Sequence, residues 1–335
     1  MRSFSSSGWR RGAAVLALAA LAGLPGCGKS APSGPAKTKL AAVVFQEDQF
    51  FRLVLLGMRE AAGKAGVELL EGNSNSRPEK EIELINTYAA RKVDAILLSP
   101  LSKKGSVTAL KLARQKGITV VTYNTAVEGD LAAAHIECSP EDLGRQTGKA
   151  ARAYIEGRLG GKARIAIVAF KSQAAEQSDA RVGGFKQAIE GLPGASVAAE
   201  QDAWLTDMAV KKVGDILTAN PDVNLVYAAN EGGTAGAVLA VRNAGKAGKV
   251  AVFGTDSSEQ LLGFLQAPDD VLQAITSQRP VDVGRRAVES ALKTLRKEAV
   301  EKQALLPGVL LSRADPGGVR EFDRQLQEWM KQAAK

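Results

Sequence analysis

The chain from residue 39 to residue 138 alternates short apolar runs with longer amphipathic stretches. Short apolar runs are typical of buried strands, and the predicted strands are 40–45, 67–71, 95–100, 118–123 and 132–137. Between them apolar residues recur at helical spacing, and the predicted helices are 50–66, 78–90 and 104–116. This alternation predicts a parallel sheet whose strands are joined by crossover helices.

The alternation restarts after Cys138. Ser139 is a candidate N-cap and Pro140 a candidate first helical residue, which predicts a helix over 139–156. The later elements are strands at 164–170, 196–200, 224–229, 249–254 and 271–277, a helix over 281–298 and one extended segment over 304–313. The chain is therefore expected to be an α/β protein of two Rossmann-like lobes with parallel sheets. A short amphipathic helix through Phe322, Leu326 and Trp329 is expected at its end.

Residues 23–30, GLPGCGKS, match the P-loop pattern G-x-x-x-x-G-K-[ST]. A P-loop binds phosphate only where it follows a buried strand and begins a helix. Here the preceding segment is rich in Ala and Leu, and the following one, SAPSGPAKTK, contains Pro and Gly residues that prevent a stable helix. Neither flank fits, so the sequence does not predict a nucleotide site there.

The same segment fits an export signal. Three arginines, at positions 2, 10 and 11, precede an apolar stretch over 13–24. This stretch is too short to cross a bilayer but suits a secretory signal. The stretch ends in Leu-Pro-Gly-Cys27, which resembles the lipobox of bacterial lipoproteins, where the cysteine is lipidated. We therefore predict a signal peptide over 1–26, then a lipidated Cys27 and a flexible linker over 27–37. An ordinary cleaved signal is the alternative.

Charge and composition narrow the classes of function. The formal net charge is +8, or +5 without the three arginines of the predicted signal, and basic residues alternate with acids along the predicted helices. No basic run with interleaved aromatics is present, so no nucleic-acid partner is expected. With one histidine and only two cysteines, neither a metal site nor a histidine-dependent triad is expected. His135 and Cys138 are interpreted as structural residues.

Polar residues follow almost every predicted strand. Ligands of parallel α/β sheets bind beyond the carboxyl ends of the strands, so these residues are candidates for a site. Amides, carboxylates and a guanidinium recur there with aromatic rings, as in Phe50, Phe51, Asn124, Arg181, Trp204, Asn230, Asp256 and Gln278. Planar hydrogen-bonding groups and aromatic faces are what a hydroxyl-rich ring requires. The pattern indicates a cleft for a carbohydrate-like ligand.

Six segments carry a resemblance to a known family over nearly all of the chain after the linker. The strongest is TANPDVNLVYAANEGGTAGAVLAVRNAGK, and the others are VDAILLSP, ITVVTYNT, SDARVGGF, VAVFGTDSS and AITSQRPVDVGRRAVE. Together they resemble type I periplasmic solute-binding proteins of the ribose- and galactose-binding group. The resemblance implies two lobes joined by a three-crossing hinge near Cys138, Gln278 and Pro307. It implies an N-terminal lobe of 38–138 plus 279–308, a C-terminal lobe of 139–278 plus 309–315, and a C-terminal helix over 316–335.

The resemblance also assigns roles to polar residues. Arg181 matches the arginine that grips ring hydroxyls, and Asn230 and Asp256 match polar residues that follow strands. Gln278 matches the glutamine that closes the site at the interlobe crossover. Glu137 is a further candidate contact at a crossover.

The resemblance also assigns roles to the aromatic candidates, and two more polar candidates come from the strand ends. Phe50 and Phe51 match an aromatic pair on the first helix, and Trp204 lies near the position of a second stacking aromatic. Gln49, beside the pair, and Asn124, after the fourth strand, complete the predicted ligand-binding set.

Structural alternatives exist for several of these residues. Phe50 and Phe51 would otherwise form the core face of a helix, and Trp204 would pack between loops. Arg181 would be a surface ion-pair partner, and Asp256 would be a helix N-cap.

The sequence departs from the ribose-binding pattern at three places. Asn124-Thr125 stands where ribose binders have Asp-Arg, Glu231 replaces an aspartate, and QEDQFF lacks the Asn-Pro that precedes the aromatic pair. These departures put ribose itself in doubt but leave a carbohydrate-class ligand.

The resemblance implies a monomeric, membrane-anchored lipoprotein in the periplasm or at the cell surface, without catalytic activity or cofactor. It would capture a sugar or related polyol by hinge closure and deliver it to the permease of an ABC importer. A sensory role beside a chemoreceptor or signalling kinase is the alternative on the same scaffold. A transcriptional regulator would need a helix-turn-helix where the predicted signal and linker stand. An enzyme would need a nucleophile elbow, dinucleotide fingerprint or metal set, and none is visible.

Overall fold

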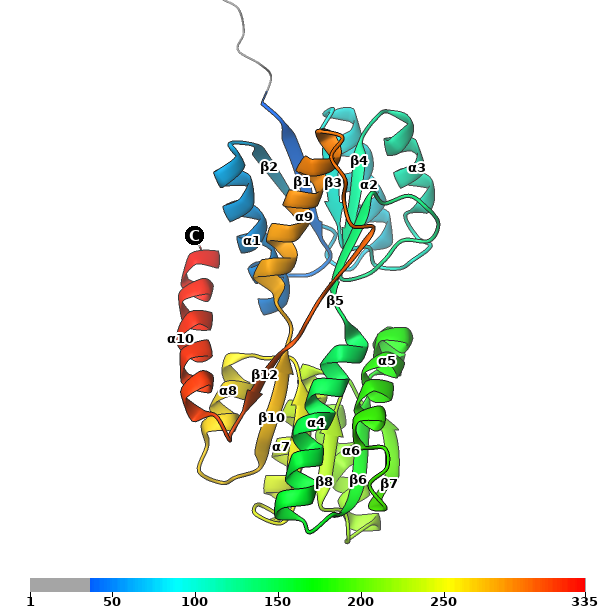
Figure 1. Cartoon of the computed structure of the whole chain (residues 1–335). Helices are drawn as coiled ribbons and strands as arrows, with labels where there is room; N and C mark the ends of the chain where they lie inside the picture. Colours follow the sequence, from blue (N-terminus) through cyan, green and yellow to red (C-terminus); the bar gives the residue numbers. More distant parts are fainter. Residues whose placement is uncertain (1–36, 335) are drawn as a thin grey trace, which may run out of the picture. The chain divides into compact units, whose positions relative to one another are not determined.

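Two six-stranded sheets, each flanked by helices, form two α/β lobes (Figure 1). The computed structural model describes residues 37–334, so the predicted signal peptide, Cys27 and the linker up to residue 36 lie outside the described residues. The first lobe contains β1 (Lys39–Val44), α1 (Gln49–Ala65), β2 (Glu68–Asn73), α2 (Pro78–Ala90), β3 (Ala95–Leu98), α3 (Val107–Gln115), β4 (Thr119–Tyr123), β5 (Ala134–Cys138), α9 (Pro280–Leu295) and β11 (Gln303–Leu306). Its strand order is β11-β5-β4-β3-β1-β2, and all pairs are parallel.

The second lobe repeats this plan. It contains α4 (Pro140–Arg158), β6 (Lys162–Ala169), α5 (Lys171–Ile189), β7 (Gly194–Asp202), α6 (Thr206–Ala219), β8 (Leu225–Ala228), α7 (Glu231–Asn243), β9 (Ala251–Thr255), α8 (Glu259–Gln266), β10 (Leu272–Ser277) and β12 (Val309–Ser312). The order β12-β10-β9-β8-β6-β7 matches that of the first sheet, except that β12 runs antiparallel to β10. A last helix, α10 (Pro316–Ala333), follows β12.

The strand order places a topological switch point in each lobe. β1 lies between β2 and β3, and β6 lies between β7 and β8. The chain leaves β1 and β3 toward opposite edges of the first sheet, and β6 and β8 toward opposite edges of the second. In open α/β sheets ligands bind at such points. A ligand site is therefore expected at the segments that follow β1 and β6.

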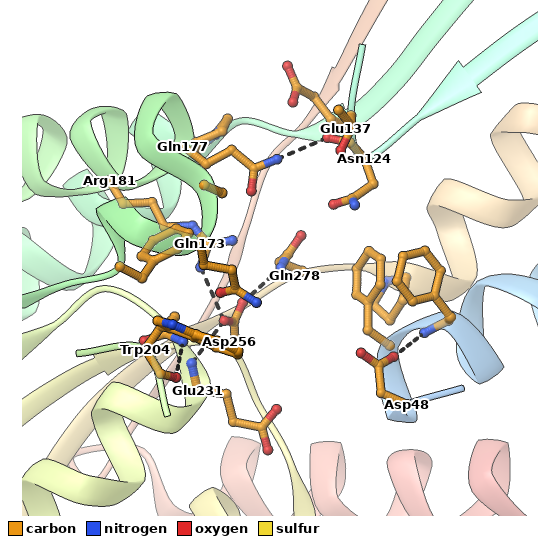
Figure 2. A pocket seen from close by; sticks show the side chains of 18 of the residues that line it. Asp48, Asn124, Glu137, Gln173, Gln177, Arg181, Trp204, Glu231, Asp256 and Gln278 are labelled. Atoms are coloured by element: carbon orange, nitrogen blue, oxygen red, sulfur yellow. Dashed lines mark hydrogen bonds and ion pairs between the residues drawn. The ribbon is translucent and has the colours of Figure 1, made fainter. Parts of the chain in front are cut away.

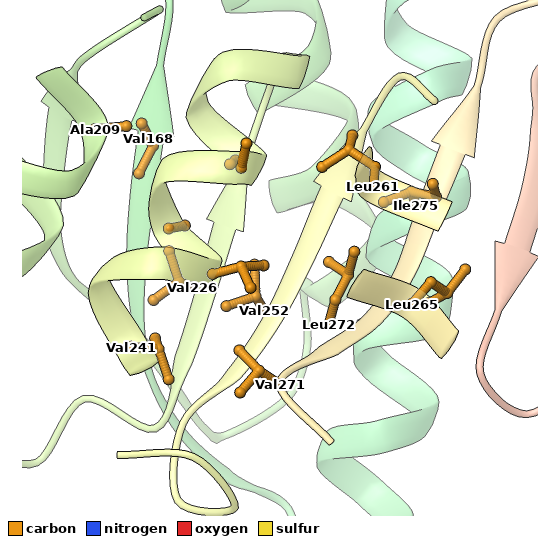
Figure 3. Packing of buried hydrophobic residues seen from close by; sticks show 14 of the residues in the cluster. Val168, Ala209, Val226, Val241, Val252, Leu261, Leu265, Val271, Leu272 and Ile275 are labelled. Atoms are coloured by element: carbon orange, nitrogen blue, oxygen red, sulfur yellow. The ribbon is translucent and has the colours of Figure 1, made fainter. Parts of the chain in front are cut away.

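Buried strands hold each lobe together. Figure 3 shows Val226, Val252 and Ile275 on neighbouring strands of the second sheet, covered by Val241 of α7 and Leu261 of α8. All five side chains are fully buried. A parallel sheet covered by helices on both faces requires this continuous apolar character, which explains why the strands could be predicted from short apolar runs.

Glycines allow two pairs of helices to approach closely. A Cβ on Gly57 of α1 would lie 2.0 Å from the carbonyl oxygen of Val281, and a Cβ on Gly284 of α9 would lie 2.0 Å from that of Val54. In the second lobe, α4 and α5 meet in the same way through Gly144 and Gly184. No larger residue fits at these contacts without separating the helices.

Three chain crossings join the lobes, from β5 to α4, from β10 to α9 and from β11 to β12 (Figure 1). The backbone N–H of Arg279 donates to Sγ of Cys138 at 3.2 Å, which ties the first two crossings together. The third is bonded to α4, because the N–H of Gly308 donates to the Asp142 carboxylate at 3.2 Å. The three crossings thus form one connected hinge.

Element boundaries follow local signals closely, with one correction. α2 spans the predicted 78–90, α1 ends before Gly66 at φ +67°, and the side chain of Ser139 caps α4. The single extended segment predicted over 304–313 is wrong. It is two strands in different sheets, because Pro307 and Gly308 interrupt it at the interlobe crossing. Among the described helices, none combines the length and the apolar character needed to cross a membrane.

Candidate functional site

A cavity of about 1090 Å³ lies between the lobes, at the carboxyl ends of both sheets. Its walls include the segments after β1 and β6, as the switch points predict, and the starts of α5 and α7. All ten residues predicted as ligand-binding line it, namely Gln49, Phe50, Phe51, Asn124, Glu137, Arg181, Trp204, Asn230, Asp256 and Gln278. The fold therefore brings together side chains that are spread over more than two hundred positions of the sequence.

The centre of the site is a network around the Asp256 carboxylate. Figure 2 shows the interactions that converge on Asp256. Its Oδ2 accepts hydrogen bonds from Nη1 of Arg181 and from the backbone N–H of Glu231, each at 3.1 Å, and its Oδ1 accepts one from Nε2 of Gln278 at 2.8 Å. A carboxylate has about four acceptor positions, so roughly one remains for a hydroxyl group in the cavity.

Arg181 is held in place by more than this carboxylate. It lies on α5, is only 5% exposed, and donates from Nη1 to the carbonyl of Ala229 at 2.9 Å. Its guanidinium lies 5.1 Å from the ring centre of Phe170. Its Nε is buried and makes no hydrogen bond among the described residues. The surface ion-pair alternative for Arg181 is therefore wrong, because the side chain is buried and its ion pair with Asp256 lies inside the cavity wall.

Two cavity residues sit in the left-handed backbone region at corresponding positions in the lobes. Asn124 follows β4 with φ +59°, and Asp256 follows β9 with φ +73°. Asn and Asp tolerate this conformation better than other residues that carry a side chain. The N-cap of α8 is Ser258, which accepts from the N–H of Leu261, so Asp256 is not the cap of the helix that follows it.

The aromatic candidates differ in their environments. Phe51 is 2% exposed and packs edge-to-face against Phe45 and Phe50, so the core alternative holds for most of its ring. Phe50 is half-buried at the cavity wall of the first lobe. Trp204 is also half-buried, on the side of the second lobe. Phe50 and Trp204 are therefore the rings that remain available from opposite lobes.

Asn230 holds the loop that carries Trp204. Its Oδ1 accepts from the N–H of Gly233 and so caps α7, and its Nδ2 donates to the carbonyl of Trp204 at 2.9 Å. Half of its hydrogen-bonding capacity is used in these two contacts. Asn230 thus positions the tryptophan while its remaining capacity faces the cavity.

Side chains also reach across the cavity from lobe to lobe. Nε2 of Gln49 donates to the carbonyl of Ser257 at 3.0 Å, and Nε2 of Gln177 donates to the carbonyl of Asn124 at 3.1 Å. Lys103 forms an ion pair with Glu176. Gln49, predicted to bind ligand, therefore contacts the opposite lobe here. The lobes touch at several points around the cavity.

The crossover candidates lie beside a buried histidine. Glu137 and His135 are on β5, where Oε2 of Glu137 is 3.6 Å from Nε2 of His135, and Nδ1 of His135 is 3.0 Å from Oγ1 of Thr122. Cys138 is buried next to them, and burial raises the pKa of its thiol to about 11. Cys138 lies in the hinge, where it accepts from the N–H of Arg279, whereas His135 is buried on β5 and also lines the cavity.

The cavity lining also contains polar residues that were not sequence candidates, among them Asp48, Gln173, Gln177 and Glu231. Asp48 caps α1 by accepting from the N–H of Phe51 at 2.9 Å, and an Asp just before a predicted helix was the signal that could have identified it. Gln173 and Gln177 lie on α5 and had no distinct sequence signal.

Glu231 points into the cleft from the first turn of α7 (Figure 2). Glu231 is exposed in the open cleft, but the protein packed around its carboxyl reduces its solvation and raises its pKa, while a hydrogen bond to Ser258 acts in the opposite direction. The nearby charges of Asp256 and Asp48 raise its pKa further. The cavity therefore disfavours additional negative charge.

No group of three or more His, Cys, Asp or Glu side chains within residues 37–334 is arranged to hold a metal ion. The carboxylates of Asp48 and Asp256 in the cavity accept hydrogen bonds.

Comparisons with known proteins show which family has a similar sequence and fold. The sequence profile of the family described as periplasmic binding protein domain matches residues 41–299. The ABC transporter periplasmic-binding protein YphF of Escherichia coli is 30% identical over 83% of this chain and 86% of its own length. The ribose import binding protein RbsB of Salmonella typhimurium is 31% identical over 79% of this chain and 88% of its own. A periplasmic solute-binding protein of an ABC transporter from Actinobacillus succinogenes, solved with D-allose, is 25% identical, covering 84% of this chain and 100% of its own, with a TM-score of 0.75.

Proposed function

Because this chain belongs to the periplasmic binding protein domain family, we propose that it is an extracytoplasmic lipoprotein that captures a sugar or related polyol and delivers it to an ABC importer. The observation that carries this proposal is the interlobe cavity, in which the Arg181, Asp256 and Gln278 network faces half-buried aromatic rings. A sugar ring presents hydroxyl groups at its edge and C–H bonds on its faces, and this wall offers a partner to each.

In the proposed complex the ligand uses groups that the protein leaves free. A ligand hydroxyl donates to the remaining acceptor position of Asp256, and another accepts from the part of the Arg181 guanidinium that lines the cavity. Phe50 and Trp204 stack on the ring from the two lobes. Closure occurs about the three crossings, with 38–138 plus 279–308 and 139–278 plus 309–315 moving as the two bodies.

The charges lining the cavity restrict the ligand further. Five acids line it (Asp48, Glu137, Glu176, Glu231 and Asp256), together with only two cations, Lys103 and Arg181. Both cations are already paired, Lys103 with Glu176 and Arg181 with Asp256. An anionic ligand would meet uncompensated carboxylates, so the lining charges argue against sugar acids and sugar phosphates and agree with the neutral sugar or polyol proposed.

We expect neutral sugars or polyols to stabilise residues 37–335 and sugar acids or sugar phosphates to have no effect. A ligand at one hundred times its dissociation constant raises the free energy of unfolding by about 2.7 kcal/mol. Thermal unfolding with D-ribose, D-allose, xylitol and myo-inositol, each beside D-gluconate and ribose 5-phosphate, measures this. If only the anions shift the transition, the charge argument is wrong; if no sugar or polyol shifts it, the proposed function is wrong.

The lipid anchor at Cys27 is proposed from the sequence alone, since this residue lies outside the described range. Expressed in a bacterium, the wild-type chain should incorporate labelled fatty acid and sediment with membranes. Cys27→Ser should do neither, whereas Cys138→Ser should behave as the wild type because Cys138 is buried. Absence of label from the wild-type chain would contradict the proposed anchor.

A further inference from the structure

We propose that α10 is a strap that connects the two lobes, limits the opening of the cleft and thereby increases ligand affinity, with Trp329 as its positioning residue. The proposed effect on affinity rests on the function proposed above, whereas the effect on opening does not. The apolar face of α10, its packing partners, its polar contacts and its position at the cavity support the proposal.

The first is the amphipathic face of the helix. Six apolar residues recur on α10 at spacings of one, three or four, namely Val319, Phe322, Leu326, Trp329, Met330 and Ala333. The other face is charged, and Arg324 pairs there with Glu321 and Glu328. Val319 and Leu326 are only 2% and 1% exposed. One face of α10 is therefore buried as deeply as the core of a domain.

The second is what this face packs against. The apolar cluster that contains Val319 and Leu326 also contains Leu265 of α8 in the second lobe and Leu53 and Leu56 of α1 in the first. Figure 1 shows α10 beginning beside β12 and α8 and ending beside α1, in agreement with its contacts to all three elements. The helix thus joins one apolar core across two lobes.

Polar contacts attach two different parts of α10 to different lobes. Near its middle, Asp323 accepts from Nε2 of Gln266 on α8 at 3.0 Å. At its last turn, the carbonyl of Ala333 accepts from Nη1 of Arg59 on α1 at 3.4 Å. The first half of the helix is therefore attached to the second lobe and the final turn to the first lobe.

The last of these features is that the helix reaches the ligand cavity. Phe322, Leu326 and Trp329 line the cavity together with Leu53 of α1. α10 consequently forms a side wall of the cleft at the place where the two lobes come apart when it opens.

These contacts favour the less open arrangement. Glutamine side chains already bridge the lobes from Gln49 to Ser257 and from Gln177 to Asn124, so the contacts of α10 are formed while the lobes touch. Wider opening would separate the apolar face of α10 from Leu53 and Leu56 of α1 and expose apolar surface to water. Without the strap the binding-competent arrangement is less populated, and the apparent dissociation constant rises in inverse proportion.

Trp329→Ala in residues 37–335, one compact unit with complete cores, tests the strap. We expect a larger radius of gyration for the ligand-free protein by small-angle scattering. For whichever of D-ribose and D-allose binds, we expect about tenfold weaker affinity and a faster dissociation rate. Deletion of 316–335 should produce both effects more strongly. Gln332→Ala, a neighbouring change on an exposed position of the same helix, is the matched control and should change neither.

The outcomes separate the strap from a purely stabilising helix. If Trp329→Ala lowers the unfolding temperature while the ligand-free radius and the affinity stay at wild-type values, α10 only adds stability and the proposal is wrong. If the deletion variant does not fold, Trp329→Ala decides alone. If neither D-ribose nor D-allose binds, the affinity is measured with the sugar or polyol that stabilises the wild type, and the ligand-free radius tests the strap in either case.

Discussion

Arg181→Ala should weaken sugar binding about five- to 150-fold. The side chain is buried, and its removal takes away the donors at the cavity wall and leaves the Asp256 carboxylate without its charged partner. An unpaired buried polar group costs about 1–3 kcal/mol, which corresponds to this loss of affinity. Isothermal titration calorimetry with the sugar that stabilises the wild type measures the effect.

Asp256→Asn should weaken binding through the other partner. Asparagine keeps the size of the side chain but replaces one carboxylate oxygen with an NH2 group, which cannot accept a hydrogen bond, so either Arg181 or Gln278 loses its acceptor. The remaining contact from Arg181 to the carbonyl of Ala229 holds the guanidinium in place. The variant should therefore lose affinity while it retains its fold.

Arg164→Ala is the matched control for both variants. Arg164 also pairs with an aspartate, Asp222, at 3.0 Å, but this pair is exposed on the surface of the second lobe. Exposed pairs contribute little, so affinity and stability should change by less than about 0.5 kcal/mol. Wild-type affinity in both Arg181→Ala and Asp256→Asn would move the proposed site elsewhere.

Alanine substitutions at two neighbouring glycines of α5 should change the free energy of unfolding in opposite directions. A Cβ on Gly184 would lie 2.1 Å from the carbonyl oxygen of Glu141 on α4, whereas a Cβ on Gly183 meets no atom within 4 Å. Gly184→Ala should destabilise the fold by about 1–3 kcal/mol or more, because the helices must separate. Gly183→Ala should stabilise it by about 0.5–1 kcal/mol, since alanine loses less entropy in a helix.

The close contact between α4 and α5 also positions Arg181 in the site. A Cβ on Gly144 of α4 would lie 1.8 Å from the backbone carbonyl of Arg181, so the close approach of the helices determines where that arginine stands. Gly184→Ala should thus weaken ligand binding as well, and Gly183→Ala should not. Urea unfolding and calorimetry of both variants test this. Equal stability of the two variants would show that the helices can separate without cost.

The sequence predicted the secondary structure well wherever a local signal was present. α2 begins at Pro78 and α1 ends before Gly66, because proline and glycine act through their own backbone preferences. The strands of both sheets were recognisable because parallel strands are buried on both faces. The start of α3 lies later than expected, at Val107, since fraying at helix ends depends on contacts rather than on periodicity.

The candidate site was predictable only as a set of strand ends. Residues after parallel strands gather at one edge of a sheet, and all ten candidates line the cavity for this reason. Their individual contacts were not predictable. Gln49 reaches the opposite lobe and Asn230 caps a helix while holding Trp204, because the partner in each case comes from a distant part of the chain.

The sequence by itself determined the order of strands and helices, the two-lobed α/β class and the strand ends at which polar side chains collect. These features depend on periodicity and on backbone preferences, which act over a few residues. Only the tertiary structure decided that Arg181 is buried against Asp256 and that α10 packs on both lobes. These features depend on contacts between residues far apart in the chain, and no local pattern specifies which distant surface an amphipathic face will meet.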